Sequence, residues 1–149
     1  MRAVVQRVSN ACVQVAERPV GEIDRSLLIY LGVAADDTEQ DVAYTVNKVR
    51  HLRVFQDDAG KMNLDVQQIA GGCLVVSAFS TQGDARRGHR PAYTAAAEPE
   101  MARAMYEEFC AKLGETGLQV ATGEFRATMD VVSVNDGPIC VLIDSKKTF

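Results

Sequence analysis

The sequence predicts an α+β fold: a single domain over residues 1–149, in which mostly antiparallel β-sheets form a barrel-like sandwich with two flanking helices. Three observations lead to this prediction. Short apolar runs recur along the chain, each ended by turn-forming residues, a pattern typical of strands. Only two segments repeat apolar residues at helical spacing. No linker, repeat or low-complexity tract divides the 149 residues, which are enough for one core.

The first quarter of the chain has the pattern of an antiparallel meander. Residues 2–8 and 11–16 have strand-like composition, and Ser9-Asn10 between them predicts a tight turn. A short strand is expected around Val20–Ile23. The continuous apolar run Leu27–Val33 predicts a strand that is buried on both faces.

The two helices are predicted by caps and by apolar stripes. Asp36-Asp37-Thr38 supplies capping oxygens for a helix that should run to about Leu52, with valines at helical spacing on one face. Glu98-Pro99-Glu100 places proline and carboxylates in the first turn of a second helix, and Gly114 is a suitable stop. Its Met and Phe stripe is interpreted as core packing.

The remaining segments are predicted as strands. Arg53–Leu64 should form a short strand, a polar turn and an extended return. The other expected strands are Cys73–Phe79, Leu118–Ala121, Thr128–Val134 and Ile139–Ile143. At the junction of the last two, Asn135-Asp136-Gly137-Pro138 by itself predicts a hairpin turn, although a proline after a turn glycine also suits a strand's first residue, an edge or a bulge.

Composition excludes several function classes. Apolar residues make up 47% and charged residues 24% of the chain, as in ordinary soluble proteins, and no apolar run is long enough to span a bilayer. We therefore expect a cytoplasmic protein with no membrane partner. The net charge of −4 does not suggest a general nucleic-acid binder, and Arg86, Arg87 and Arg90 form the one candidate basic patch.

The cysteines and the absent motifs argue against cofactor chemistry. The four cysteines stand singly, without a Cys-x-x-Cys pair, and are interpreted as reduced core thiols: Cys12, Cys73, Cys110 and Cys140. We expect no metal and no organic cofactor, because no zinc-protease, phosphate-loop or dinucleotide motif occurs. A serine hydrolase built from Ser80 and His89 is a weak alternative. Main-chain N–H groups at a strand end offer another hydrolytic route, since they can stabilise an oxyanion.

The chain as a whole resembles the D-aminoacyl-tRNA deacylases of the D-tyrosyl-tRNA deacylase type. The resemblance runs from Met-Arg-Ala-Val-Val-Gln-Arg-Val at the start to Asn-Asp-Gly-Pro near the end. The intermediate matches are Gly60-Lys61-Met62-Asn63, the stretch from Ser77 to Pro91, Ala121-Thr122-Gly123 with Phe125, and Met129. Coverage of this extent is more specific than any single motif.

The resemblance implies an active site without cofactors. A Ser-Gln-Phe-Thr segment of the family falls on Ser77, Ala78, Phe79 and Ser80, and a Gly-Pro dipeptide with a cis bond falls on Gly137 and Pro138. Ser77, Phe79 and Ser80 would be the catalytic residues. The substrate-binding residues would be Gly137, Pro138, Arg7, Ala78 and Met129, and Arg86, Arg87 and Arg90 would contact tRNA.

The resemblance also implies a partner and a basis for selectivity. The family is a homodimer in which the Gly-Pro element of one subunit reaches into the pocket of the other. Its backbone carbonyls would bind the α-ammonium of the aminoacyl group and leave no room for an L side chain. The expected reaction is hydrolysis of the ester of D-aminoacyl-tRNA, and glycyl-tRNA would also pass the filter. Arg7 matches the arginine thought to hold the Gly-Pro carbonyls, and the alternative interpretation of Arg7 is a surface salt bridge.

Two departures from the family pattern keep an alternative open. The family glutamine is Ala78 here, which removes one polar contact, and the threonine after Gly-Pro-x is Cys140. The family threonine of the first segment is Ser80, which keeps the hydroxyl. The alternative is a diverged dimeric paralogue with an RNA-binding or altered-substrate role and weak or no deacylase activity.

Overall fold

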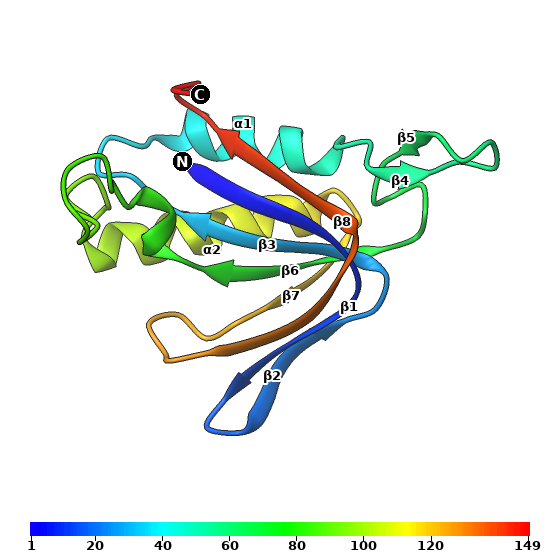
Figure 1. Cartoon of the computed structure of the whole chain (residues 1–149), viewed down its shortest axis with the longest axis horizontal. Helices are drawn as coiled ribbons and strands as arrows, with labels where there is room; N and C mark the ends of the chain where they lie inside the picture. The colour runs from blue at the N-terminus through cyan, green and yellow to red at the C-terminus, as the bar shows by residue number, and fades with distance from the viewer.

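The computed structural model describes residues 1–149 as one curled, mixed sheet with two helices and a small hairpin (Figure 1). Its strands are β1 (Arg2–Val15), β2 (Arg18–Ile23), β3 (Ser26–Gly32), β6 (Gly72–Ser77), β7 (Gln119–Thr122) and β8 (Asp130–Asp144), and the hairpin is β4 (Phe55–Gln56) with β5 (Met62–Leu64). The helices are α1 (Glu39–Arg50), α2 (Pro99–Glu115) and the 3₁₀ turn η1 (Phe79–Gln82). The predicted α+β fold is confirmed.

The long strand β1 organises the sheet. Its first half pairs with β3 and its second half with β2, while β8 runs antiparallel along its other edge. Beyond β3 the sheet continues through β6 to β7, and these two contacts are parallel. Because β1 changes partners halfway, the sheet folds back on itself, and Figure 1 shows β2 and β7 approaching across the resulting curl. The barrel-like shape follows from this geometry.

Alternation of side chains along β3 accounts for its continuous apolar run. Successive side chains of a strand point to opposite faces. Leu27 and Ile29 join the main core under the two helices, whereas Leu28 joins a second cluster inside the curl. Both faces are thus covered, as the sequence predicts. None of the helices combines the length and apolarity that crossing a bilayer requires.

Both helices match their predicted positions. Thr38 caps α1, and a reciprocal bond from its backbone N–H to the Asp41 carboxylate completes a capping box. Helix α2 begins at Pro99 and buries Phe109 and Leu113 of the predicted stripe, and Tyr106 beside them. The N-terminus of α2 lies at the end of the molecule where β6 ends, which brings it to the pocket described below.

The predicted turn at Ser9-Asn10 is wrong. β1 continues through these residues, and its register with β8 shifts between Val8 and Asn10. The extra residue is therefore absorbed as a bulge in one long strand. Two polar residues between strand-like segments are compatible with a bulge as well as with a turn, so the sequence alone does not distinguish the two.

The predicted hairpin at Asn135-Asp136-Gly137-Pro138 is also wrong. β8 is continuous from Asp130 to Asp144, and both halves pair with β1. Gln6 faces Cys140 and Val8 faces Asn135, so residues 136–139 stand opposite a single residue of β1. This segment is a large bulge on an edge strand, and its Gly137–Pro138 peptide bond is cis.

Three of the four cysteines depart from the expected full burial. Cys73 is buried, Cys12 and Cys110 are partly buried, and Cys140 is exposed. Cys140 lies just after the bulge, where β8 is the edge of the sheet and its outward side chains have no cover. The interpretation as a core thiol is therefore wrong for Cys140.

Candidate active site

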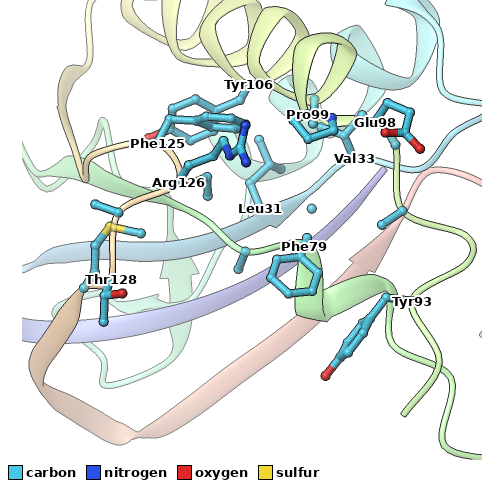
Figure 2. Close-up of a pocket in the computed structure, with 18 residues that line it drawn as sticks. Leu31, Val33, Phe79, Tyr93, Glu98, Pro99, Tyr106, Phe125, Arg126 and Thr128 are labelled. Carbon is cyan, nitrogen blue, oxygen red and sulfur yellow. The ribbon is translucent and has the colours of Figure 1, made fainter.

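A pocket of about 620 Å³ opens where β3 and β6 end, beside the first turn of α2 (Figure 2). Eighteen residues line it, and twelve of them are hydrophobic. Leu31 and Val33 come from β3 and its continuation, Ala102 from α2, and the loop 125–129 before β8 forms the far wall. A concave, largely apolar cavity with a few polar groups is the usual form of a small-ligand site.

Buried aromatic groups fix one wall of this pocket. The Tyr106 hydroxyl donates to the Val75 carbonyl oxygen at 2.8 Å, and its ring lies 5.9 Å from that of Phe125. Burial raises the pKa of Tyr106, so its hydroxyl stays protonated and keeps donating to the strand. Tyr106 is therefore a structural group, because its proton is committed to β6.

The strand end of β6 supplies the polar part of the pocket. Ser77 and Ala78 line it, and the Ala78 N–H donates to the Leu31 carbonyl at 2.8 Å. The next residues turn into η1. A 3₁₀ helix bonds each N–H to the third carbonyl before it, so its first N–H groups, those of Phe79 and Ser80, have no acceptor inside the helix.

An aromatic pair forms the rim of the pocket. Phe79 is 62% exposed, and its ring packs edge-on against Tyr93 with centroids 4.9 Å apart. Both rings line the pocket, as Figure 2 shows. An exposed phenylalanine held at a pocket mouth offers a flat face on which a nucleobase can stack.

No cysteine, histidine or lysine lines the pocket, and its one carboxylate, Glu98, lies at the mouth. Burial raises the pKa of Cys73 to about 12 and that of Cys110 to about 11, which keeps both thiols protonated at neutral pH. Among the His, Cys, Asp and Glu side chains, no group of three or more gathers to hold a metal ion. The polar groups at the strand end are therefore main-chain amides and the hydroxyl of Ser77.

Comparison with known proteins identifies the family. The family model described as D-Tyr-tRNA(Tyr) deacylase matches residues 4–144. The chain belongs to this deacylase family. The resemblance inferred from the sequence is thereby confirmed.

Relatives match along the whole length. A D-aminoacyl-tRNA deacylase from Thermotoga petrophila is 55% identical over 149 residues, covering all of both chains, and one from Desulfotalea psychrophila is 50% identical with the same coverage. A solved structure titled c-Myc DNA Unwinding Element Binding Protein superposes with a TM-score of 0.92 at 34% identity, covering 97% of this chain and 98% of that one. A probable eukaryotic D-amino acid tRNA deacylase shares the fold, with a TM-score of 0.82 at 14% identity, 95% of this chain and 97% of that chain being covered.

The deacylase segment predicted from the sequence lies partly in the pocket. Ser77, Ala78 and Phe79 line it, and so does Met129 from the opposite wall. Ser80 is exposed on η1 and does not line the cavity. The structure thus brings together four of these predicted residues, from β6 and from the loop before β8.

The other predicted elements of the deacylase site lie elsewhere in the same chain. The bulge 136–139 stands opposite Arg7, which pairs with Leu27 near the start of β3. The pocket begins at Leu31, four residues or about 13 Å farther along β3 than Leu27. Gly137 and Pro138 are exposed and take no part in the pocket of their own chain.

Arg7 is buried, which contradicts its interpretation as a surface salt bridge. Its Nε lies 3.0 Å from Asp136 Oδ2 and donates to the Asp136 carbonyl at 3.2 Å, while Nη1 donates to the Val54 carbonyl at 2.5 Å. The arginine therefore ties the bulge to the stem of the β4–β5 hairpin. Its hydrogen bonds reach the carbonyl before Gly137, so it holds this element through Asp136.

The basic loop stands apart from the pocket. Arg86, Arg87 and Arg90 are all exposed. Arg86 is committed to Asp84, with Nε 2.9 Å from Oδ1 and Nη2 2.7 Å from Oδ2. The other two arginines remain the available cations of this loop.

Much of the pocket wall comes from residues that the sequence did not single out. Tyr93, Ala102 and Arg126 line the cavity from three separate segments. Glu98 and Pro99 were predicted only as a helix start, yet they lie at the pocket mouth (Figure 2). The sequence carries no local signal for this role, because the pocket forms only when α2 packs beside β3 and β6.

Filling the pocket should abolish its function without unfolding the chain. Ala102 faces the pocket from α2, whereas Ala104 on the same helix is exposed. Leucine has nearly the helix propensity of alanine, so Ala102→Leu should leave α2 folded. Its larger side chain would displace the bound substrate, and a small displacement can lower kcat/KM for the D-ester by about a hundredfold. Ala104→Leu is the matched control. Equal activity of the two variants would place the site elsewhere.

Proposed function

We propose that this chain hydrolyses the ester bond of D-aminoacyl-tRNA, as a homodimer and without metal or organic cofactor. The observation that carries the proposal is the pocket of this family member, which gathers Ser77, Ala78, Phe79 and Met129 around one cavity. Charged catalytic side chains are missing from the strand end, which suits a substrate that is already an activated ester. The terminal adenosine would occupy the pocket, with Phe79 beside its base.

The chemistry would rest on the backbone at the start of η1. The N–H groups of Phe79 and Ser80 lack helical acceptors and can donate to the oxyanion that forms when water attacks the ester carbonyl. The bond from the carbonyl carbon to the ribose oxygen then breaks, and that oxygen takes a proton. The neighbouring ribose 2′-hydroxyl is close enough to relay it. The products are a free D-amino acid and uncharged tRNA.

A second copy of the chain would complete the site. The bulge with Gly137 and Pro138 is level with Leu27, about 13 Å along the strand direction from Leu31 of the pocket, and β1 separates it from β3. It can therefore act on a pocket only from a partner. It lies on the edge strand β8, whose exposed side chains include Val132, Val134 and Leu142. An apolar, unpaired edge of this kind favours pairing with another chain.

The partner's bulge would provide chiral selectivity. Backbone carbonyls close to the substrate Cα can accept hydrogen bonds from the α-ammonium and leave no space on the side where an L residue carries its side chain. Any D residue would be accepted, and glycyl-tRNA would pass as well. Arg7 supports this element through its bonds to Asp136 and Val54.

The basic loop would meet the acceptor end of the tRNA. Arg87 and Arg90 are the exposed cations that no carboxylate engages there, while Arg86 is shared with Asp84. Each phosphate contact should make binding weaker as salt rises. We expect the reaction to take place in the cytoplasm, where charged tRNA is used.

The test is release of tyrosine from matched D- and L-tyrosyl-tRNA by the purified protein, with and without a chelator. Rapid, chelator-insensitive hydrolysis of the D-ester alone supports the proposal. No hydrolysis of either ester would favour the alternative, a diverged paralogue that binds RNA or takes another substrate, for which Ala78 is the motivating replacement. Ala78→Gln should raise the affinity for tRNA or the rate if the missing amide contact is what weakens the reaction.

Ser80→Ala distinguishes backbone from hydroxyl catalysis. Ser80 does not line the cavity and its backbone N–H survives the substitution, so we expect kcat to fall by less than about tenfold. Single-turnover hydrolysis of D-tyrosyl-tRNA measures this change. A loss beyond about a thousandfold would make the hydroxyl a nucleophile and overturn the backbone mechanism.

A further inference from the structure

Arg126 lies at the pocket wall in a backbone conformation that arginine rarely adopts. Its φ is +67°, in the left-handed region, where the Cβ of an ordinary L residue crowds the backbone. Glycine would occupy this position without that crowding. An unfavourable conformation retained at a binding site motivates a search for a function of the side chain.

The surroundings leave the Arg126 side chain free. It is exposed, and no carboxylate lies within salt-bridge distance of its guanidinium. Its neighbour Arg103 is committed instead: the guanidinium stacks over the Phe125 ring at 4.7 Å from the centroid, and Nη1 lies 3.7 Å from Glu107. Arg126 is therefore the uncommitted cation at this wall.

Arg126 lies where the pocket continues outward. It lines both the pocket and an adjoining open hollow of about 440 Å³. The two cavities share Glu98, Pro99 and Arg126, and the hollow adds Glu100 and Arg103. Figure 2 shows Arg126 and Glu98 on opposite sides of the opening beside α2. A ligand that fills the pocket and extends out of it must pass between them.

The charges at this opening select the side on which a phosphate can lie. Glu98 and Glu100 repel an anion from their side. Arg126, opposite Glu98, offers a planar fork of N–H donors that matches two phosphate oxygens. The terminal nucleoside of a tRNA enters such a pocket with its 5′ phosphodiester trailing behind it, and this phosphate would leave through the opening.

We propose that Arg126 binds the phosphodiester on the 5′ side of the terminal adenosine. The proposal rests on the proposed function, since it requires the adenosine in the pocket. It names a contact that is independent of the basic loop. The contact belongs to substrate binding, because Arg126 stands at the opening and away from the ester.

The test compares two substrates that differ in this phosphate: D-tyrosyl-tRNA and the ester 2′(3′)-O-D-tyrosyladenosine. Arg126→Gly removes the cation and relieves the left-handed strain, so its melting temperature should not fall. We expect kcat/KM for D-tyrosyl-tRNA to fall by about tenfold, which is the effect of losing one charge-assisted contact. The kcat/KM for D-tyrosyladenosine should not change. The dependence of log kcat/KM on log salt should become shallower by about 0.7.

Lys147→Gly is the matched control. Lys147 also has a left-handed backbone, with φ +55°, and the substitution removes one exposed cation outside the pocket. It should leave both substrates unaffected. Arg126→Lys should recover part of the loss, since a point charge replaces the fork.

The outcomes separate this inference from the proposed function. If the wild-type protein hydrolyses neither D-ester, the proposed function fails. If it hydrolyses both and Arg126→Gly changes neither, or if Arg126→Gly lowers both equally, the phosphate contact is refuted while the deacylase function stands. If Arg126→Gly and Lys147→Gly lower kcat/KM for D-tyrosyl-tRNA by the same factor, the effect comes from the overall charge of the protein, and the phosphate contact is again refuted.

Discussion

Replacing Gly137 with alanine is expected to lower kcat/KM for D-tyrosyl-tRNA by about a hundredfold or more, the cost of small misplacements in a catalytic site. Gly137 has φ +125°, which L residues rarely adopt. A Cβ there would lie 2.8 Å from Ile139 Cγ1 and 3.0 Å from Arg7 Nη2. The bulge must therefore move, and its carbonyls with it. Hydrolysis of D- and L-tyrosyl-tRNA by the purified variant measures the effect.

Gly117→Ala provides the control for backbone strain alone. Gly117 also has a positive φ, +88°, but a Cβ there would meet no atom within 4 Å. Gly117→Ala should lose a small amount of thermal stability and no activity, whereas Gly137→Ala should lose activity and, because of its close contacts, more stability. An unchanged rate for Gly137→Ala would remove the bulge from the site.

Placing charges on the outer face of β8 should dissociate the proposed dimer and abolish activity together. Val132 and Leu142 are 57% and 58% exposed on this edge strand, on either side of the bulge. Val132→Asp combined with Leu142→Asp would bury two carboxylates in any interface formed here, which is strongly unfavourable. We expect a folded monomer by analytical ultracentrifugation and a loss of D-ester hydrolysis exceeding about a hundredfold.

The matched control puts the same charge on an exposed apolar residue outside β8. Phe149 is 67% exposed at the end of the chain. Phe149→Asp should leave both the sedimentation and the activity unchanged. A β8 variant that sediments as a monomer and still hydrolyses the D-ester at the wild-type rate would contradict a site shared between subunits.

Local sequence signals predicted the helices and strands that are specified by neighbouring residues in the sequence. The capping residues before α1, the proline at the start of α2 and the apolar run of β3 each have a physical meaning that needs no distant partner. The parallel pairing of β3 with β6, and of β6 with β7, carries no such signal. It depends on where the two helices return the chain.

The two wrong turn predictions share one cause: long strands that absorb extra residues. Ser9-Asn10 and residues 135–138 have turn composition, but β1 and β8 are held along their whole length by each other. Pairing over so many residues outweighs local turn preference. The same pairing buries Arg7 against Asp136, which no spacing in the sequence could indicate.

The candidate site was predictable only in part, and mainly through the family resemblance. The segment Ser77–Ser80 was identified from the sequence, and three of its four residues line the pocket. Arg126 and Ala102 were not, because their role depends on how the loop before β8 and helix α2 meet. The separation of Gly137 from the pocket appears only in the folded chain.

The most direct test of a shared site is complementation between two inactive variants. Subunits carrying Gly137→Ala and subunits carrying Ala102→Leu are co-expressed with different tags, and the mixed dimer is isolated. One of its two sites then combines an intact pocket with an intact bulge from the partner, so the mixed dimer should regain about half of the wild-type kcat for D-tyrosyl-tRNA. A mixed dimer as inactive as either parent would contradict the account.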